Sequence, residues 1–313
     1  MNEIRPKNFN EFIGQENLIE ILKVYCDVAI KENKALKHIL FYGLPGTGKT
    51  SLGFLIANEL KVKIHFINAN NIHNQSDLIS LFSLIQTNDI VFIDELQSID
   101  LKIVELLYPM MEDYYIDIPL GKDFNKKSTR IKIPPFSLIA STTSIGKIQK
   151  PLLDRFQLVY KMQNYSENDL IKILNNIILL KNLNNLIKMN DLEILTKYCK
   201  FNPRIAINLL LQVIDFRLIN KDISIDTILT KLKIYHYGLT VSDLEYLKVI
   251  HQNNNVAIGI KTLVQITGYD SYTIENYIEP FLLKINLLTK TSKGRILTKK
   301  GIELLNNLEN EIN

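Results

Sequence analysis

The chain has 313 residues, 46% hydrophobic and 22% charged, with a net charge of +4 that alone does not indicate nucleic-acid binding. This length exceeds what one hydrophobic core usually serves, so two or three domains are expected. No apolar run is long enough to span a membrane and no apolar signal core opens the chain, so we expect a cytoplasmic protein without membrane contact.

The first half of the chain alternates between two kinds of pattern. Short apolar or β-branched runs, which predict strands, lie at 37–42, 62–68, 90–93 and 136–142. Helical patterns lie between them at 49–60, 76–86 and 101–111. This alternation indicates crossover units and a parallel sheet covered on both faces. Two extended runs around a polar tip predict an inserted β-hairpin over about 115–133.

Strands are expected to end after about Asp154. Helical patterns follow at 166–180, 191–199, 202 onward and 226–235. Ser166 and Asp169 have the spacing of a capping box, and Asn202 with Pro203 has the pattern of a helix start. These segments predict a small helical domain.

A third unit is expected from about residue 237. Helices are predicted at 242–251, with a capping box formed by Ser242 and Glu245, at 260–267 and at 271–285. Short strands follow at 287–291 and 295–298. Three helices followed by a basic hairpin are typical of a winged helix, a variant of the helix-turn-helix.

The strongest functional signal is the run Gly-Leu-Pro-Gly-Thr-Gly-Lys-Thr at 43–50, a complete Walker A sequence between a strand and a helix. Gly46 and Gly48 let backbone N–H groups crowd around phosphate oxygens at the positive end of the helix. Lys49 is expected to neutralise the β- and γ-phosphates, and the Thr50 hydroxyl to bind Mg²⁺. A chance match has odds of roughly one in a hundred, so we expect ATP and Mg²⁺.

Two carboxylates, Asp94 and Glu95, end the apolar strand that follows. Asp94 is expected to hold Mg²⁺ and Glu95 to activate the attacking water as a general base. A polar turn after a strand is the alternative, which the upstream Walker A sequence makes less favoured. Thr142 ends another strand, where its hydroxyl can bond the γ-phosphate or the water; alone this signal is weak.

Arginines and lysines later in the chain have candidate phosphate roles. Arg155 can act as an arginine finger on a neighbour's γ-phosphate or form a salt bridge with Asp154, with even weight on local sequence. Arg204 begins a helix, where a cation is unfavourable unless a phosphate is near. A basic cluster fits DNA phosphates or a solvated lysine-rich face, and it comprises Lys284, Lys290, Lys293, Arg295, Lys299 and Lys300.

From Ile4 to about Lys300 the chain resembles the RuvB family of Holliday-junction branch-migration motors, which are AAA+ ATPases. The family-specific stretches are Leu-Tyr-Pro-Met-Met-Glu-Asp-Tyr at 107–114 and Pro-Arg-Ile-Ala at 203–206. The expected fold is an α/β P-loop AAA+ domain with a parallel sheet and inserted β-hairpin (1–163), a small helical lid domain (164–236) and a C-terminal winged helix (237–313). The chain departs from the usual family pattern at Gln97-Ser98, after the acidic pair, and at Leu153, before Asp154.

The resemblance also implies roles for individual residues. The base and ribose would be framed by Ile4, Arg5 and Tyr165. The phosphates would be held by Gly46, Gly48, Lys49, Thr50 and Ser51, with Arg204 reaching the γ-phosphate in cis and Arg155 in trans. Glu112, Asp113 and Tyr114 would lie near the nucleotide. DNA phosphates would be met by Lys290, Lys293 and Arg295.

The activity implied by the resemblance is ATP-dependent DNA translocation that drives branch migration in recombination and repair. The partners implied are duplex and four-way junction DNA, a hexameric ring of copies, RuvA docked on the 115–133 hairpin, and the RuvC resolvase. Two alternatives stay open. A clamp-loader-type AAA+ subunit would lack the winged helix, and a scaffold without turnover is disfavoured by Glu95, Arg155 and Arg204.

Overall fold

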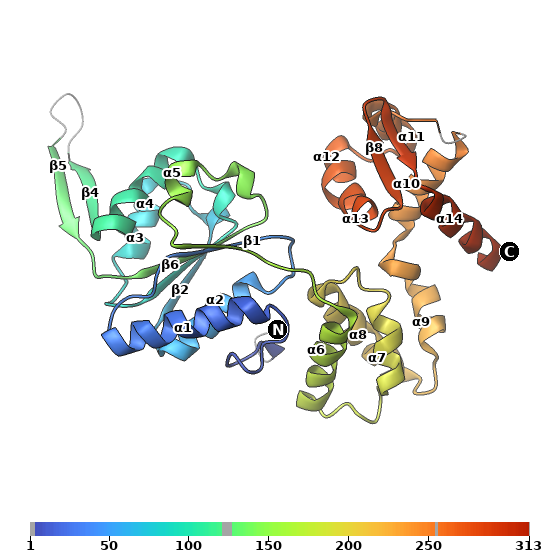
Figure 1. The fold of residues 1–313 in the computed structure, drawn as a ribbon, viewed down its shortest axis with the longest axis horizontal. Coiled ribbons are helices and arrows are strands. Elements are labelled where there is room, and N and C mark those ends of the chain that lie inside the picture. Colours follow the sequence, from blue (N-terminus) through green and yellow to red (C-terminus); the bar gives the residue numbers. More distant parts are fainter. Residues whose placement is uncertain (1–3, 121–126, 254–255, 313) are drawn as a thin grey trace. The chain divides into compact units, whose positions relative to one another are not determined.

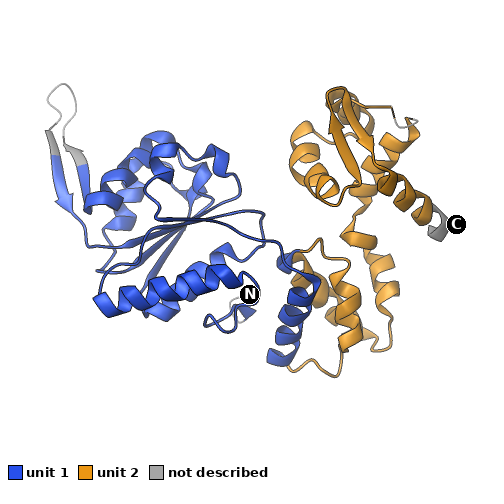
Figure 2. Cartoon of the chain, in the orientation of Figure 1, with its two compact units in different colours: residues 1–181, 202–204 blue, residues 182–201, 205–313 orange. Residues whose placement is uncertain are grey.

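The computed structural model describes residues 4–120, 127–253 and 256–312. The chain divides into two compact units (Figure 2): unit 1 is Met1–Lys181 with Asn202–Arg204, and unit 2 is Asn182–Phe201 with Ile205–Asn313. Unit 1 contains the P-loop domain and the first helix of the helical region, and unit 2 contains the rest of that region and the winged helix. Because the helical region is divided between the units, the three-domain boundaries at 163 and 236 stay a prediction.

Unit 1 is built on a parallel sheet (Figure 1). Its strands are β1 (Ile39–Tyr42), β2 (Ile64–Asn68), β3 (Ile90–Asp94), β6 (Ser137–Thr142) and β7 (Leu158–Lys161), in the order β2-β3-β6-β1-β7. The predicted parallel sheet is confirmed. The expectation that strands end after Asp154 is wrong, because β7 lies beyond it. This edge strand is only half-buried, so its sequence lacks the continuous apolar run of a central strand.

Helices cover both faces of this sheet. On one face lie α1 (Glu16–Glu32) and α2 (Lys49–Leu60); on the other lie α3 (Gln75–Phe82) and α4 (Leu101–Asp113). Successive strand residues point to opposite faces. Phe92 therefore packs in the cluster with α1 and α2, and its neighbour Val91 packs in the cluster with α3 and α4.

The carboxyl ends of the central strands meet at one edge. β1 and β6 pair in register up to Tyr42 and Thr142, and Ile93 of β3 pairs with Ala140 of β6. The loop after β1, the acidic pair after β3 and the threonines ending β6 therefore lie side by side. This is the edge at which open α/β sheets place ligands.

The predicted hairpin is present and consists of the antiparallel strands β4 (Tyr115–Leu120) and β5 (Lys127–Lys132). Arg130 forms an ion pair with Asp117 at 3.0 Å and lies 3.9 Å from the centre of the Tyr115 ring. The tip at 121–126 lies outside the described residues. Unit 1 also contains α5 (Lys150–Leu153) and α6 (Glu167–Leu180), and α6 begins at the predicted capping box of Ser166 and Asp169.

Three helices precede the winged helix of unit 2 in the described chain. They are α7 (Met189–Thr196), α8 (Pro203–Ile219, which begins in unit 1) and α9 (Ile225–Leu232). As predicted, Asn202 caps α8, because its side chain accepts a hydrogen bond from the Arg204 N–H at 2.9 Å. Within unit 2, Arg217 of α8 forms an ion pair with Asp191 of α7. Lys200 likewise pairs with Asp243 at 2.7 Å.

The winged helix follows the predicted order of elements. It comprises α10 (Val241–Gln252), α11 (Ile260–Thr267), α12 (Ser271–Thr273), a π turn (Ile274–Ile278), α13 (Glu279–Lys284), β8 (Leu288–Thr291), β9 (Gly294–Leu297) and the unpredicted α14 (Lys299–Ile312). The capping box of α10 is formed by Thr240 and Asp243, so the predicted pair Ser242 and Glu245 is wrong by two residues. Asp243 is buried, and the same carboxylate oxygen that accepts from the Thr240 N–H also pairs with Lys200.

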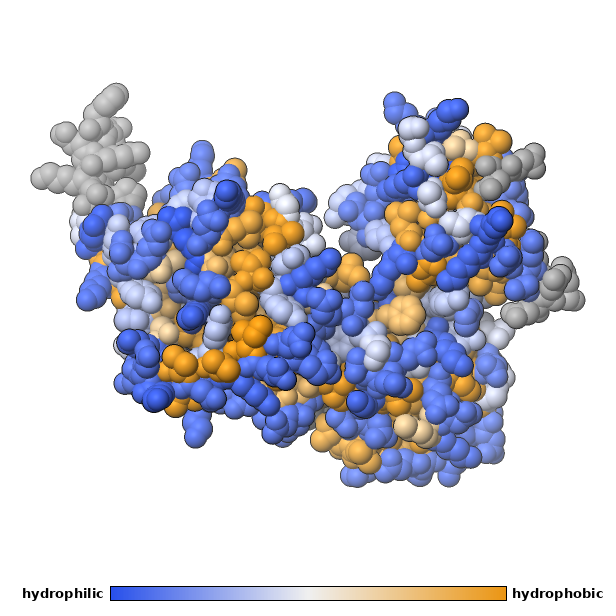
Figure 3. Space-filling model, in the orientation of Figure 1, coloured by the Kyte–Doolittle hydropathy of each residue, from blue (hydrophilic) through white to orange (hydrophobic). Residues whose placement is uncertain are grey.

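No helix within the described ranges has the length and apolar character needed to cross a membrane. On the face drawn in Figure 3, hydrophilic and hydrophobic side chains are intermixed over both units.

Candidate functional site

The loop between β1 and α2 has a backbone that requires glycine. Gly46 and Gly48 have φ values of 80° and 94°, in the left-handed region. A Cβ atom on Gly46 would lie 2.5 Å from Oδ1 of Asn202. The glycines therefore permit both the turn and the close approach of the 202–204 segment, and α2 starts at Lys49 directly after them.

Lys49 is a buried cation without a carboxylate in direct contact among the residues described. Its side-chain Nζ donates hydrogen bonds to the backbone oxygens of Gly43 and Leu44, both at 2.8 Å. Burial lowers the pKa of Lys49 to about 8, against the opposing attraction of Glu95 and Asp94. A buried ammonium bonded to carbonyls can exchange them for phosphate oxygens, so the loop fits a nucleotide.

Asp94 and Thr50 present the oxygen atoms that a magnesium ion prefers. Asp94 is half-buried at the end of β3 and accepts a hydrogen bond from the Ser141 hydroxyl. Within the described ranges, no group of three or more His, Cys, Asp or Glu residues could hold a metal ion. Mg²⁺ is usually bound through one or two protein oxygens together with substrate phosphates, and these two residues fit that chemistry.

Glu95 is tethered to the end of β6. Its backbone has φ 54° and ψ 47°, which directs the chain into the short turn Leu96–Ser98. The Glu95 carboxylate accepts hydrogen bonds from Gln97 Nε2 at 2.5 Å and from the Thr143 hydroxyl at 3.2 Å. The Thr142 hydroxyl is fully buried and donates to Gln97 Oε1 at 2.5 Å. Sequence reasoning noted Gln97 only as a departure from the family pattern.

Arg204 lies beside the phosphate loop, and its contact with a phosphate stays a prediction. Asn202 Nδ2 donates to the backbone oxygen of Pro45 at 2.8 Å, and the Cβ of Arg204 is 2.9 Å from the position that a Cβ on Gly46 would take. The Arg204 side chain is exposed. Its charge acts on Lys49, whose pKa it lowers in addition to the larger effect of burial. A polyanion at this loop would relieve that repulsion.

The three residues expected around the base are placed differently. Tyr165 is buried, and its hydroxyl donates to the backbone oxygen of Thr47 in the phosphate loop at 3.2 Å. The Arg5 guanidinium lies 4.5 Å from the centre of the Phe54 ring on α2, and Ile4 is half-buried. The structure therefore brings Tyr165 to the loop, while Arg5 packs on the helix that follows it.

Arg155 lies with the 112–114 segment. It forms an ion pair with Glu112 at 3.1 Å, donates to the backbone oxygen of Pro151 at 2.6 Å and lies 4.2 Å from the centre of the Tyr108 ring. Its Nε is buried without a hydrogen-bond partner in the structure as described. The local ion pair is formed with Glu112 and not with the alternative Asp154. Glu112, Tyr114 and Arg155 line one pocket, and Asp113 is exposed at the end of α4.

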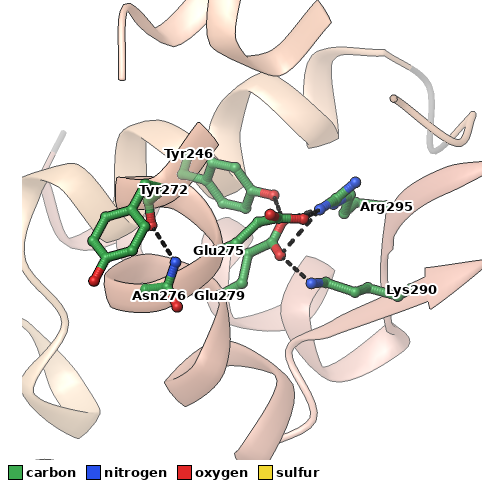
Figure 4. A network of polar contacts seen from close by, with 7 residues as sticks. All are labelled: Tyr246, Tyr272, Glu275, Asn276, Glu279, Lys290 and Arg295. Carbon is green, nitrogen blue, oxygen red and sulfur yellow. Dashed lines mark hydrogen bonds and ion pairs between the residues drawn. The ribbon is translucent and has the colours of Figure 1, made fainter. Parts of the chain in front are cut away.

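The basic wing is held by a buried carboxylate (Figure 4). Glu279 is fully buried and meets Arg295 Nε at 2.7 Å, Lys290 Nζ at 2.6 Å and the Tyr246 hydroxyl at 2.5 Å. A further ion pair joins Arg295 to Glu275 at 2.8 Å. Burial raises the pKa of Glu279, but the hydrogen bonds from Arg295, Lys290 and Tyr246 outweigh it, so the net pKa is lowered.

These contacts separate the three candidate DNA-binding residues. Arg295 is 9% exposed and its guanidinium is already paired with two carboxylates. Lys290 is paired but its side chain is 42% exposed. Lys293 is exposed at the tip between β8 and β9, and in the part of the chain described no carboxylate lies within ion-pair distance of it. Sequence composition does not distinguish these states, and contact with DNA stays a prediction for all three.

Comparison with known families gives two matches to this chain. The "Holliday junction DNA helicase RuvB P-loop domain" matches residues 4–162, and the "RuvB C-terminal winged helix domain" matches residues 236–306. The chain belongs to the RuvB family. The fold expected from the resemblance is thereby confirmed, from the parallel-sheet P-loop domain through the helical region to the winged helix.

RuvB relatives match over nearly their whole length. The Holliday junction branch migration complex subunit RuvB of Mycoplasmopsis synoviae is 42% identical, covering 97% of this chain and 98% of the relative. The RuvB subunit of Mycoplasma genitalium is 39% identical, covering 97% and 99%. The solved structure of the Thermotoga maritima RuvB Holliday junction branch migration motor is similar with a TM-score of 0.83 at 31% identity, covering 97% and 98%.

Proposed function

We propose that this RuvB-family chain is an ATP hydrolase that uses ATP to move DNA and drive branch migration of Holliday junctions. The observation that carries the proposal is the edge of the sheet where the charges of Asp94 and Glu95 act on the buried Lys49, beside a phosphate loop whose backbone requires glycine. The RuvB relatives are named for branch migration, and the winged helix supplies a DNA-binding element. A clamp-loader-type subunit would lack that element.

In this mechanism the chain's own groups hold and activate the reactants. Lys49 and Ser51 would hold the phosphates, and Thr50 and Asp94 would hold Mg²⁺, which would neutralise charge developing on the phosphate oxygens. Glu95 orients and deprotonates the attacking water. Arg204 stabilises the γ-phosphate of the ATP that is bound to the same subunit.

Arg155 completes the site of a neighbouring copy in this proposal. A role for Arg155 in a neighbour's site requires that copies of the chain form a ring, which we propose to be a hexamer around duplex DNA. Its buried and unpartnered Nε and its place away from the phosphate loop's own contacts support a role in trans. Glu112, Asp113 and Tyr114 would then face the nucleotide of that neighbour.

The proposed complex has two partner proteins. RuvA would dock on the β4–β5 hairpin and hold the four-way junction, and RuvC would act on the same junction. The complex would work in the cytoplasm.

The test is ATP turnover of Glu95→Gln with matched nucleotide binding. We expect turnover to fall by at least about 100-fold, because the amide cannot take a proton from water, while ATP still binds. Glu105→Gln, an exposed carboxylate on α4, is the control and should behave as wild type. Turnover by Glu95→Gln at the wild-type rate would reject Glu95 as the base, and no turnover by wild type would favour a scaffold.

Branch migration on a synthetic four-way junction, with and without RuvA, tests the finer proposal. We expect ATP-dependent strand exchange by wild type and none by Glu95→Gln. ATP turnover without strand exchange in either condition would leave an ATPase whose substrate is not the junction.

A further inference from the structure

The turn after the catalytic carboxylate contains a glutamine that the proposed reaction has not used. Gln97 is half-buried in the turn Leu96–Ser98, and this turn contacts the end of β6. Its side chain reaches back to Glu95 and across to Thr142 and Thr143. One neutral amide thus touches the proposed base and both threonines at the end of the neighbouring strand.

The orientation of this amide follows from its partners. An ionised carboxylate can only accept hydrogen bonds, so the Gln97 NH₂ group must face Glu95, as the 2.5 Å contact from Nε2 shows. The amide oxygen is then left to accept from the Thr142 hydroxyl, also at 2.5 Å. The Thr142 hydroxyl has a single proton, and because it donates this proton to Gln97 Oε1, the proton is committed there, while the Thr142 oxygen accepts from the Ser144 N–H at 3.1 Å.

The donation of the Thr142 hydroxyl proton to Gln97 affects how Thr142, at the end of β6, can bind a phosphate. For Thr142 to donate to a phosphate oxygen, its hydroxyl must release Gln97, since a hydroxyl has a single proton to donate. The amide that loses this bond is the same group that holds the Glu95 carboxylate. Any change at the Thr142 hydroxyl is therefore passed to the Glu95 carboxylate through one side chain.

We propose that Gln97 is a positioning residue that orients Glu95 and couples it to the Thr142 hydroxyl. This inference rests on the proposed function, because it assumes that Glu95 is the base. The left-handed backbone of Glu95 supports it, since this conformation directs the 96–98 turn and brings residue 97 back toward the carboxylate of residue 95. The Thr143 hydroxyl, at 3.2 Å from the same carboxylate oxygen, completes the cradle.

The first experiment compares two replacements of similar length in the full chain. Gln97→Met removes both hydrogen bonds, and Gln97→Glu keeps the shape but places a carboxylate against Glu95. We expect kcat to fall roughly tenfold in the first and further in the second, with KM changed less than twofold, because proton-transfer geometry and not nucleotide binding is affected. Ser98→Ala, an exposed neighbour in the same turn, is the control and should match wild type.

Two readouts without turnover separate positioning from a structural role. The affinity for a non-hydrolysable ATP analogue and the thermal midpoint should change little in both Gln97 variants. An unchanged kcat in both variants would overturn the inference, and so would a kcat loss that only follows loss of analogue affinity or stability. In either case Glu95→Gln still reports on the proposed function: if it is inactive, the base stands without the positioning residue, and if it turns over normally, the base itself fails.

The coupling to β6 is tested by a double-mutant cycle of Gln97→Met with Thr142→Val. If one amide carries the link, the double variant should have nearly the kcat of the slower single variant, so the two losses do not multiply. Fully multiplicative losses would overturn the link to Thr142. The thermal midpoint is measured for each member, because Thr142 is fully buried and its replacement affects packing.

Discussion

Two cationic sites in this protein are prepared for phosphate in opposite ways. Lys49 in the P-loop domain is buried, held by two backbone carbonyls and shifted toward its neutral form. Arg295 in the wing is also buried, but it is held by two carboxylates, and these contacts raise its pKa. Among the described residues the first cation has no carboxylate within ion-pair distance, whereas the second already has its counter-charges within the fold.

This difference shows why a count of lysines and arginines does not identify a phosphate site. A cation is more readily available to a ligand when no buried carboxylate in the fold already holds it, and that is a property of tertiary structure. At the phosphate loop the partners come from neighbouring residues, so the motif predicts them. At the wing the partner, Glu279, is 16 residues away from Arg295.

The largest expected effect is on stability, and it tests whether the buried Glu279 carboxylate holds the wing together. Glu279→Ala leaves Arg295, Lys290 and Tyr246 around an empty buried position, and we expect unfolding free energy to fall by about 3–5 kcal/mol. Because the folded pKa of Glu279 is lowered, this stabilisation is present at neutral pH and is lost as pH falls through the lowered value. Urea unfolding of the full chain measures it.

The matched control is Glu275→Ala, which removes a half-exposed partner of the same arginine. Exposed ion pairs contribute at most about 1 kcal/mol, so this variant should remain close to wild type. If both variants lost the same free energy of unfolding, the burial of Glu279 would not be what stabilises the wing.

The next effect concerns DNA and sharpens the comparison, because Lys293, unlike Arg295, has no carboxylate within ion-pair distance among the described residues. Lys293→Ala should lower duplex affinity a few-fold at every sequence and reduce the slope of log affinity against log salt by about one. Lys231→Ala, the same charge change on α9, should leave the slope unchanged. Titration of fluorescent duplex DNA over a range of salt provides the slopes, and an unchanged slope in Lys293→Ala would remove that residue from the interface.

The smallest expected effect is the uptake of a fraction of a proton by Lys49 when ATP binds. With its pKa near 8, Lys49 is partly neutral above that pH, and phosphate oxygens favour its charged form. ATP binding should therefore take up about half a proton near pH 8 and close to none at pH 6.5. Calorimetry in buffers of different ionisation enthalpy measures the uptake. Lys49→Arg, which stays charged, is the control, and equal uptake by both proteins would assign the proton to another group.

The sequence predicted those features that depend on residues near each other in the chain. The phosphate loop, the acidic pair, the capping box at Ser166 and the order of helices and strands in the wing belong to this class. The edge strand β7 was missed because half-burial leaves it without a continuous apolar run. The roles of Gln97 and Glu279 could not be predicted, since each depends on partners brought together by folding, and the sequence shows only an ordinary polar residue at each position.

The left-handed backbone of Glu95 has an evolutionary consequence. A non-glycine residue in this conformation costs on the order of 1 kcal/mol, and glycine or asparagine would adopt it more easily. Replacement of Glu95 by glycine or asparagine would therefore abolish the base and at the same time relieve this backbone strain. Selection for thermal resistance alone would erode turnover at this position, so a carboxylate persists here only while the reaction itself is under selection.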